Sequence, residues 1–291
     1  MRQIEFLITQ KDNGRQIRDF LKNFGFSTSL INKLKKTENG ILKNGEFARA
    51  IDFLSEGDKL TINIESSGKM PEPSDAKLEI VYEDKDILVA NKPPKMPVHE
   101  SRNHRGDALS NAVAAHMLQI KEDTAFRAVY RLDRDTSGLV LIAKNELAAA
   151  KLAGKINKDY YAVVCGKISG NSIIDLPIKR LGSSIIKRGV APDGERAVTK
   201  YTSIFAGEKY SLLKVNLETG RTHQIRVHFS HLGYPLAGDD LYGQPCEDID
   251  RQALHCKAIR FTHPVTLEKM SIECDFPSDF KNLIDIAKGK N

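Results

Sequence analysis

Cysteine is scarce in this sequence, and the four residues present, Cys165, Cys246, Cys256 and Cys274, form no C-x-x-C pair. Their wide spacing argues against both a zinc framework and a disulfide scaffold. No apolar run approaches the length of a membrane span, and residues 1–14 lack the apolar segment of a secretion signal. There is no internal repeat and no low-complexity tract. These absences predict a reduced, soluble, cytoplasmic protein that has no membrane partner.

The composition is that of a globular protein with a basic surplus. Of the 291 residues, 41% are hydrophobic and 28% are charged, which is typical of a chain that can bury a substantial core. The length favours one large domain and one small one. A net charge of +6 and a pI near 9.0 favour, though only mildly, a polyanionic partner such as a nucleic acid.

Residues 1–64 have the pattern of a small α+β module. An amphipathic helix is predicted by apolar residues at helical spacing, namely Ile17, Phe20, Leu21 and Phe24. A second helix, capped within residues 27–29, is expected to expose three lysines, Lys33, Lys35 and Lys36. The Asn44-Gly45 pair favours a tight turn, and a strand is predicted by the alternation of Leu60, Ile62 and Ile64.

This order of elements resembles the S4 RNA-binding domain. The resemblance implies that the lysine-bearing second helix contacts RNA, whereas the alternative is a solvated face of a small domain. Residues 65–75 are polar and contain Gly68, Pro71 and Pro73, a composition that favours a flexible or extended linker. Residues 76–291 would then form the larger domain.

The stretch from Tyr130 to Asn145, YRLDRDTSGLVLIAKN, is the centre of the larger domain. Its residues 139–143 have the length and branching of a buried strand, and the Asp-Thr-Ser-Gly segment before them consists of turn formers. Arg131 and Asp133 are therefore expected on a loop that a rigid strand holds in place. Active sites are often built on loops of this kind.

The remaining elements of the larger domain are predicted from periodicity. Helices are expected at residues 109–120 and 145–156. Strands are expected at residues 79–82, 87–90, 158–166 and, in the final part, within 254–276. His116 is expected to pack on its helix. The polar, glycine-punctuated residues 178–197 predict a hairpin or loop.

A second informative stretch runs from Gly220 to His228, GRTHQIRVH. Alternation predicts a strand here, with Gln224, Arg226 and His228 on one face and His223 on the other. A metal site built from its histidines is disfavoured, because a strand would separate His223 from His228. The H-E-x-x-H and paired-cysteine spacings are also missing. No metal is expected.

Two interpretations of Asp133 remain open from the residues alone. An aspartic protease fails on spacing, because residues 135–138 carry an extra residue in the Asp-Thr/Ser-Gly pattern and no second copy exists. A single ionised carboxylate acting as nucleophile or base would need a cationic partner, for which Arg226 is the candidate. Alternatively, Asp133 is a turn residue and Arg226 forms an ordinary structural ion pair.

Four ordered motifs resemble those of RluA-type RNA pseudouridine synthases. They are RLDRDTSGL at 131–139, KDYYA at 158–162, GRTHQIRVH at 220–228 and GYPLAGD at 233–239, and shorter matches lie at 91–93 and 262–265. The resemblance covers roughly residues 76–280, and several ordered motifs are far more specific than one. Tyr130 stands where the family usually has histidine.

The resemblance implies an α+β fold around a mixed, largely antiparallel sheet, with the S4-like module at the N-terminus. It implies three catalytic residues: Asp133 acting on the ribose, Tyr160 stacking on the flipped base, and Arg226 paired with Asp133. Arg131 would enter the RNA where the base was extruded. Further RNA contacts are expected from Lys33, Lys35, Lys36, Arg221 and His223.

The implied reaction converts uridine to its isomer pseudouridine. Because no atoms are gained or lost and no redox change occurs, neither a cofactor nor a catalytic metal is expected. The S4-like module favours large-subunit (23S) ribosomal RNA as the substrate, and no obligate protein partner is implied. The alternatives are a transfer-RNA pseudouridine synthase and a non-catalytic RNA-binding ribosome assembly factor.

Overall fold

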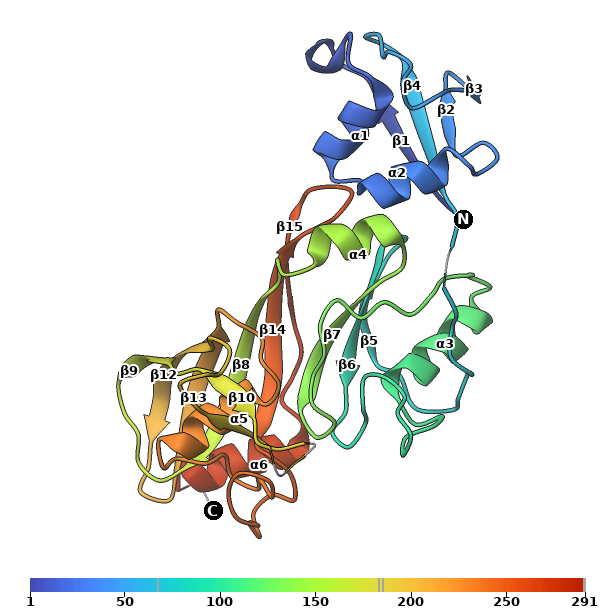
Figure 1. Cartoon of the computed structure of the whole chain (residues 1–291). Helices are drawn as coiled ribbons and strands as arrows, with labels where there is room; N and C mark the ends of the chain where they lie inside the picture. The colour runs from blue at the N-terminus through green and yellow to red at the C-terminus, as the bar shows by residue number, and fades with distance from the viewer. Residues whose placement is uncertain (67, 183, 185, 290–291) are drawn as a thin grey trace.

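The computed structural model describes residues 1–66, 68–182, 184 and 186–289, and it contains a small sheet and a large sheet joined end to end (Figure 1). The chain starts at the junction of the two parts, and the last described helix, Ser278–Ala287, lies at the far end of the larger part. None of the described helices has the length and apolarity needed to cross a membrane.

The N-terminal module, residues 1–64, is a four-stranded antiparallel sheet with two helices, in strand order β1-β4-β2-β3. Its elements are β1 (Arg2–Leu7), η1 (Gln10–Asp12), α1 (Ile17–Phe24), α2 (Thr28–Leu34), β2 (Ile41–Lys43), β3 (Glu46–Phe47) and β4 (Lys59–Ile64). The helices, the turn and strand β4 lie where the sequence predicts them, whereas strand β1 was not anticipated.

Local signals explain these boundaries. Gly25 adopts a left-handed conformation (φ 113°) that ends α1, and the Ser27 hydroxyl accepts a hydrogen bond of 3.1 Å from the Leu30 amide at the start of α2. Asn44 and Gly45 both have positive φ, 54° and 87°, as a two-residue hairpin turn of the primed type requires.

The large sheet is mixed and largely antiparallel, which confirms the predicted fold class. Its order is β5-β6-β7-β14-β8-β13-β12-β9, with β15 paired to β14, and only β14 and β7 run parallel among the described pairs. The strands are β5 (Ile80–Glu83), β6 (Ile87–Lys92), β7 (Ser137–Ala143), β8 (Asn157–Cys165), β9 (Asn171–Asp175), β12 (Val198–Ala206), β13 (Tyr210–Leu217), β14 (Leu254–Thr262) and β15 (Lys269–Glu273).

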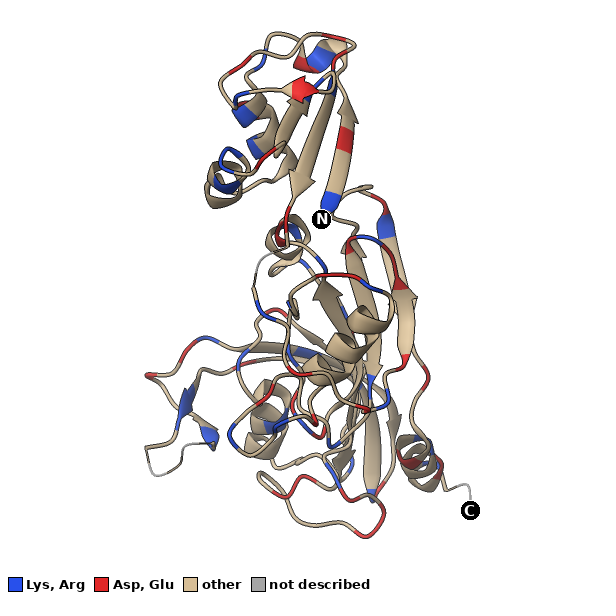
Figure 2. Cartoon of the chain, turned by 90° about the vertical axis from the view of Figure 1, so that its right-hand side faces the viewer, with Lys and Arg blue, Asp and Glu red and all other residues tan. Residues whose placement is uncertain are grey.

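Helices and one hairpin flank this sheet. They are α3 (Leu109–Gln119), α4 (Glu146–Leu152), α5 (Gln224–His231), α6 (Ser278–Ala287) and the hairpin of β10 (Ile178–Arg180) with β11 (Arg188–Val190). The hairpin alternative for residues 178–197 is therefore correct, and Figure 2 shows its basic residues on a projecting ribbon. His116 packs on α3 as expected, with its Nε2 2.7 Å from a Glu83 carboxylate oxygen.

The strand predicted at residues 220–228 is wrong, because helix α5 begins within this segment, at Gln224. His223 takes a left-handed conformation (φ 57°) and precedes the helix, which is then buried along residues 224–229. A helix buried on nearly all sides loses the 3.6-residue pattern, and alternating branched residues then imitate a strand. The consequence is functional, since His223 and Arg226 lie one helical turn apart instead of on opposite faces.

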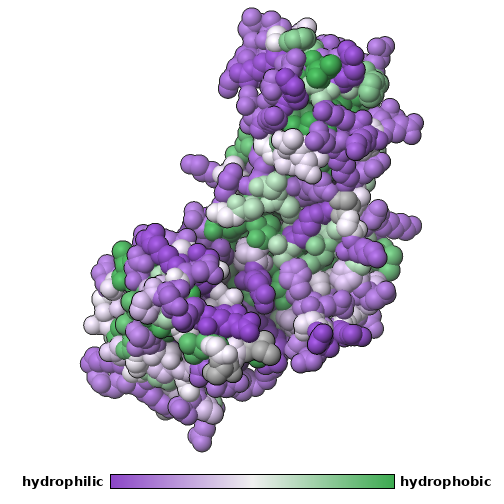
Figure 3. All heavy atoms as spheres, viewed as in Figure 1, coloured by the Kyte–Doolittle hydropathy of each residue, from purple (hydrophilic) through white to green (hydrophobic). Residues whose placement is uncertain are grey.

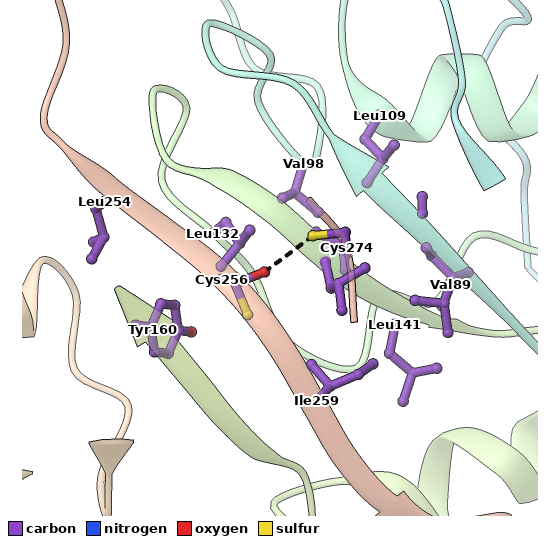
Figure 4. Packing of buried hydrophobic residues seen from close by; sticks show 14 of the residues in the cluster. Val89, Val98, Leu109, Leu132, Leu141, Tyr160, Leu254, Cys256, Ile259 and Cys274 are labelled. Carbon is purple, nitrogen blue, oxygen red and sulfur yellow. Dashed lines mark hydrogen bonds between the residues drawn. The ribbon is translucent and has the colours of Figure 1, made fainter. Parts of the chain in front are cut away.

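Buried apolar side chains form separate clusters in the two parts of the molecule. One gathers residues of the N-terminal module, and the largest surrounds strands β6, β7, β14 and β8 (Figure 4). Helix α4 bridges them, because its Leu147 is fully buried in the N-terminal cluster. Arg2 also makes a two-pronged ion pair with Asp86, with both N···O distances 2.8 Å. The exact domain limits stay a prediction.

Candidate active site

A pocket of about 260 Å³ brings the two sequence motifs together. Its walls come from the loop that precedes β7, from β8, and from the turn that leads into α5. Asp133, Tyr160, Arg221, His223 and Arg226 all line it. Figure 3 shows that this side of the molecule is hollowed between the part carrying α5 and the part carrying α3, with apolar side chains exposed in the hollow.

The loop that carries Asp133 is anchored directly after this residue, on its C-terminal side. The Lys92 ammonium is fully buried and donates to three carbonyl oxygens, of Pro93 (2.8 Å), Met96 (2.7 Å) and Arg134 (2.9 Å). Burial lowers the pKa of Lys92 to about 7. The loop then enters β7 at Ser137, four residues after Asp133. These contacts make the backbone at Asp133 rigid.

Gly138 explains why the loop can turn directly into a buried strand. Its φ is 111°, a conformation that other residues rarely adopt. A Cβ at this position would lie 2.3 Å from the Cys256 carbonyl oxygen on the neighbouring strand β14. Only glycine therefore allows β7 to pair so closely with β14 at the start of the strand.

Arg226 joins the two motifs through an ion pair with Asp133. Its Nη1 lies 3.2 Å from Asp133 Oδ2, and the Asp133 side chain is 22% exposed. No described residue donates a hydrogen bond to Asp133 Oδ1. One oxygen of this carboxylate is thus held by a cation, and the other is left for a ligand in the pocket.

A second carboxylate anchors the same guanidinium. Arg226 Nε and Nη2 each lie 2.8 Å from an oxygen of Asp239, which is fully buried. The Tyr242 ring packs 5.1 Å from the guanidinium carbon. Burial opposes the charge of Arg226, but the hydrogen bonds and charges of Asp239 and Asp133 outweigh it and raise its pKa. Arg226 is a permanent, oriented cation.

Tyr160 forms an apolar wall of the pocket. It is 5% exposed and projects from β8 into the main core, where Figure 4 shows it near Cys256, Leu132 and Leu254. Its neighbour Tyr161 faces the other side of the sheet and packs in a different cluster, as expected for adjacent strand residues. Burial raises the pKa of Tyr160 well above its ordinary value, so its hydroxyl stays protonated.

His223 lies beside Asp133 in the pocket. Its Nε2 lies 3.9 Å from Asp133 Oδ2, while its Nδ1 shares a hydrogen bond of 2.8 Å with the Tyr242 hydroxyl. Burial lowers the pKa of His223, and the charge of Asp133 only partly offsets this. Arg221 lies at the pocket edge, pairs with Glu195 and donates to the Arg196 carbonyl at 3.1 Å.

Comparison with known proteins places this geometry in one family. A family model described as RNA pseudouridylate synthase matches residues 86–231, a segment that includes Asp133, Tyr160 and Arg226. A Bacillus subtilis protein described as the uncharacterised RNA pseudouridine synthase YjbO is 38% identical over 285 residues, covering 94% of this chain and 99% of its own length. The chain belongs to the RNA pseudouridine synthase family.

Further relatives and structures agree. Ribosomal large subunit pseudouridine synthase D of Pasteurella multocida is 36% identical over 273 residues, covering 86% of this chain and 84% of its own. The structure of human RNA pseudouridylate synthase domain containing 1 superposes with a TM-score of 0.57 at 25% identity, covering 73% of this chain and 87% of its own. The RluA-type resemblance is confirmed, and the chain is an isomerase that acts on RNA.

The synthase carries Tyr130 where the family motif usually has histidine, and the structure shows what the tyrosine side chain contacts. The Tyr130 hydroxyl donates a hydrogen bond of 2.8 Å to the Leu139 carbonyl of β7. Its ring packs against the main core, behind the pocket loop. The neighbouring Arg131 is exposed at the pocket, so it is free to reach toward a bound strand.

The three lysines predicted to bind RNA differ in their surroundings. Lys33 forms an ion pair of 3.2 Å with Glu146 of α4 and therefore helps join the two parts of the synthase. Lys35 and Lys36 are exposed, and Lys35 donates to the Asn32 side chain at 3.3 Å. Of the three, Lys35 and Lys36 are thus the better placed for an external partner.

Two supporting residues lacked an assigned role at the level of sequence. Asp239 and Lys92 belong to quoted motifs, yet no local pattern links either one to Asp133. A carboxylate and histidine cluster, Asp84, Asp86 and His263, has ligand atoms within 4.8 Å of one another. Its Asp86 oxygens are already bound by Arg2, and the His263 Nε2 lies 2.9 Å from Asp84. These contacts account for the cluster without an ion.

Proposed function

We propose that this synthase isomerises specific uridines of large-subunit (23S) ribosomal RNA and that Asp133 is the carboxylate that acts on the ribose. The observation that carries the proposal is the asymmetry of Asp133, which has one oxygen paired with Arg226 and one without a donor in the pocket. A carboxylate must be ionised and accessible to attack C1′ or to remove a 2′ proton. The geometry is compatible with both routes.

The other pocket residues fit complementary roles. Tyr160 offers its buried ring for stacking of an extruded uracil, and its protonated hydroxyl suits the relay of a proton from C5. Arg226 acts through Asp133, since Asp239 fixes the guanidinium that orients the carboxylate. Exposed Arg131 is placed to fill the space that the base leaves, because a guanidinium stacks and hydrogen-bonds at once.

The RNA target is proposed from the relatives and from charge. Several relatives bear names that assign them to the ribosomal large subunit, and Lys35 and Lys36 are exposed at the C-terminal end of α2 in the S4-like module. A cytoplasmic site of action, no obligate protein partner and no cofactor are part of this proposal. A transfer-RNA substrate and a non-catalytic role in ribosome assembly remain as outcomes of the experiment.

Pseudouridine mapping of total RNA from cells lacking the gene tests the proposal. Sites in large-subunit RNA should disappear and should return with the wild-type gene but not with Asp133→Asn. Loss of sites in transfer RNA alone would contradict the proposed target. Rescue by Asp133→Asn would contradict the assigned chemistry and favour an assembly role.

A further inference from the structure

Lys158 lies inside the pocket on the same strand face as Tyr160. The two residues are separated by one position on β8, so both side chains project to the same side with Cα atoms about 7 Å apart. Both line the pocket. A uracil stacked on the Tyr160 ring would therefore have an edge within reach of the Lys158 side chain.

The Lys158 ammonium has no counter-ion among the described residues. Its Nζ lies 3.4 Å from the Ile156 carbonyl oxygen and 4.7 Å from the centre of the Tyr130 ring. Tyr130, which replaces the histidine of the family motif, thus presents an aromatic face to this cation. A ring face attracts a cation, but it supplies no negative charge.

The carboxylates nearest in sequence and in the pocket are committed elsewhere. Asp159 is buried, and it is bound by Arg260 at 2.6 Å and by Lys214 at 2.8 Å. Asp133 pairs with Arg226. By contrast, buried Lys144 forms ion pairs with two glutamates of its own. Lys158 is a half-buried cation that faces a pocket without a partner.

In this position the charged form of Lys158 is destabilised unless an anion binds next to it. Burial lowers the pKa of Lys158, because the charged form has lost water and gained little in return. A ligand that brings negative charge into the pocket would remove this penalty. The arrangement therefore suits a site where negative charge develops during a reaction, as preorganised donors do in other enzymes.

The proposed reaction produces a charge of this kind. When the N1–C1′ bond breaks, its electron pair stays on the uracil, whose negative charge spreads to its carbonyl oxygens. The electron deficiency that remains at C1′ is relieved either by a bond to the attacking carboxylate of Asp133 or by loss of the 2′ proton. The base then turns and C5 forms a bond to C1′, while either the bond between Asp133 and C1′ breaks or a proton returns to C2′. The C5 hydrogen leaves as a proton, and N1 takes up a proton. A detached uracil anion occurs on both routes.

We propose that Lys158 is a further catalytic residue, whose ammonium group donates a hydrogen bond to a carbonyl oxygen of the detached uracil and stabilises its negative charge while the base turns. This inference rests on the proposed function. Two residues of β8 would then contact the same base: Tyr160 would stack on its face, and Lys158 would donate a hydrogen bond at its edge.

The test compares Lys158→Met, which keeps the length of the side chain without its charge, with Lys158→Arg. Lys155→Met is the control, since this exposed lysine lies just before β8 and does not line the pocket. We expect Lys158→Met to lower the single-turnover rate of pseudouridine formation by about 10²- to 10³-fold, with RNA affinity within threefold of wild type. Lys158→Arg should recover part of the rate, and Lys155→Met should equal wild type.

A second substrate separates charge stabilisation from a structural role. RNA with 5-fluorouridine at the target releases a more acidic base, which needs less help to leave as an anion. The rate deficit of Lys158→Met, measured as conversion of 5-fluorouridine to any rearranged nucleoside, should then be at least tenfold smaller. An equal deficit on both substrates, an unchanged rate, or a loss confined to RNA affinity would each overturn the role. Inactive wild-type protein would instead contradict the proposed function itself.

Discussion

Two arginine–aspartate pairs in different regions of the molecule illustrate two uses of the same contact. At the joint between the N-terminal module and α4, both oxygens of Asp86 are bound by Arg2, and Asn145 adds a third hydrogen bond of 2.8 Å. In the pocket, Asp133 receives one hydrogen bond of 3.2 Å from Arg226, and its other oxygen has no donor among the described residues.

The difference teaches how to distinguish a structural carboxylate from a reactive one. In a saturated carboxylate such as Asp86, both oxygens accept hydrogen bonds from protein groups, and the carboxylate serves to fix two elements together. An under-coordinated carboxylate beside a rigid cation keeps one oxygen accessible to a ligand. In the pocket, Asp239 is the carboxylate whose two oxygens are both bound. It holds Arg226 in place, and Asp133 keeps one oxygen without a donor.

The largest expected effect on stability comes from removing the contacts of Asp239 with Arg226. Asp239→Asn leaves buried Arg226 short of a counter-charge, so we expect about 3–5 kcal/mol lower stability. Misplacement of Arg226 should also lower pseudouridine formation by about 10²-fold. Urea denaturation and single-turnover rates measure the two losses. Asp240→Asn, at the exposed neighbouring residue, is the control, and full activity in Asp239→Asn would refute the supporting role.

A substitution at the joint between the N-terminal module and α4 should lower stability without changing the chemistry of the pocket. Leu147→Ala opens a cavity where α4 enters the N-terminal cluster, and we expect about 2–5 kcal/mol lower stability with the pocket chemistry intact on a short RNA. Leu118→Ala, at a 70% exposed helical leucine, should change stability by less than about 0.5 kcal/mol. Equal stability of the two variants would show that the joint contributes little.

A buried histidine beneath the pocket loop predicts the pH dependence of stability. Ser137 Oγ lies 2.9 Å from His255 Nδ1, and burial lowers the pKa of His255 from 6.5 to about 3. As the pH falls below 6.5, the unfolded chain takes up a proton that the folded chain refuses. The unfolding free energy should therefore fall by up to about 1.4 kcal/mol per pH unit.

Urea titrations between pH 7 and pH 4 measure this slope. His255→Gln should reduce it, whereas His231→Gln, at an exposed histidine of α5, should leave it unchanged. An identical slope in wild type and His255→Gln would assign the acid sensitivity to other groups.

The smallest expected effect concerns the two exposed lysines that follow α2, Lys35 and Lys36. Lys35→Glu with Lys36→Glu should weaken RNA binding and reduce the salt dependence of affinity by about 0.7–0.9 logarithmic units for each RNA phosphate that is no longer neutralised. Lys269→Glu with Lys281→Glu makes the same charge change at two other exposed positions and should have less effect. Equal weakening by the two double variants would indicate a general charge effect and would remove the S4-like role.

Most of the fold could be predicted from periodicity and turn signals in the sequence, whereas the pocket residues were predicted from the resemblance of their motifs to those of the family. The loop of Asp133 is an example, with glycine required at 138 by the close approach of β14. The helix α5 could not be predicted, since its burial on nearly all sides erased the helical pattern. The residues that contact Arg226 and Lys158 in the pocket come from distant segments, and no local sequence pattern predicts these contacts.

The most direct test of the central claim is the single-turnover rate of purified Asp133→Asn on its mapped RNA, with affinity and unfolding free energy measured alongside. The under-coordinated carboxylate should be essential for chemistry alone, so we predict a rate at least about 10⁴-fold lower. RNA affinity and stability should remain near those of wild type. A rate within tenfold of wild type would show that Asp133 is not the reacting group, and a collapse of stability would make it a structural carboxylate like Asp86.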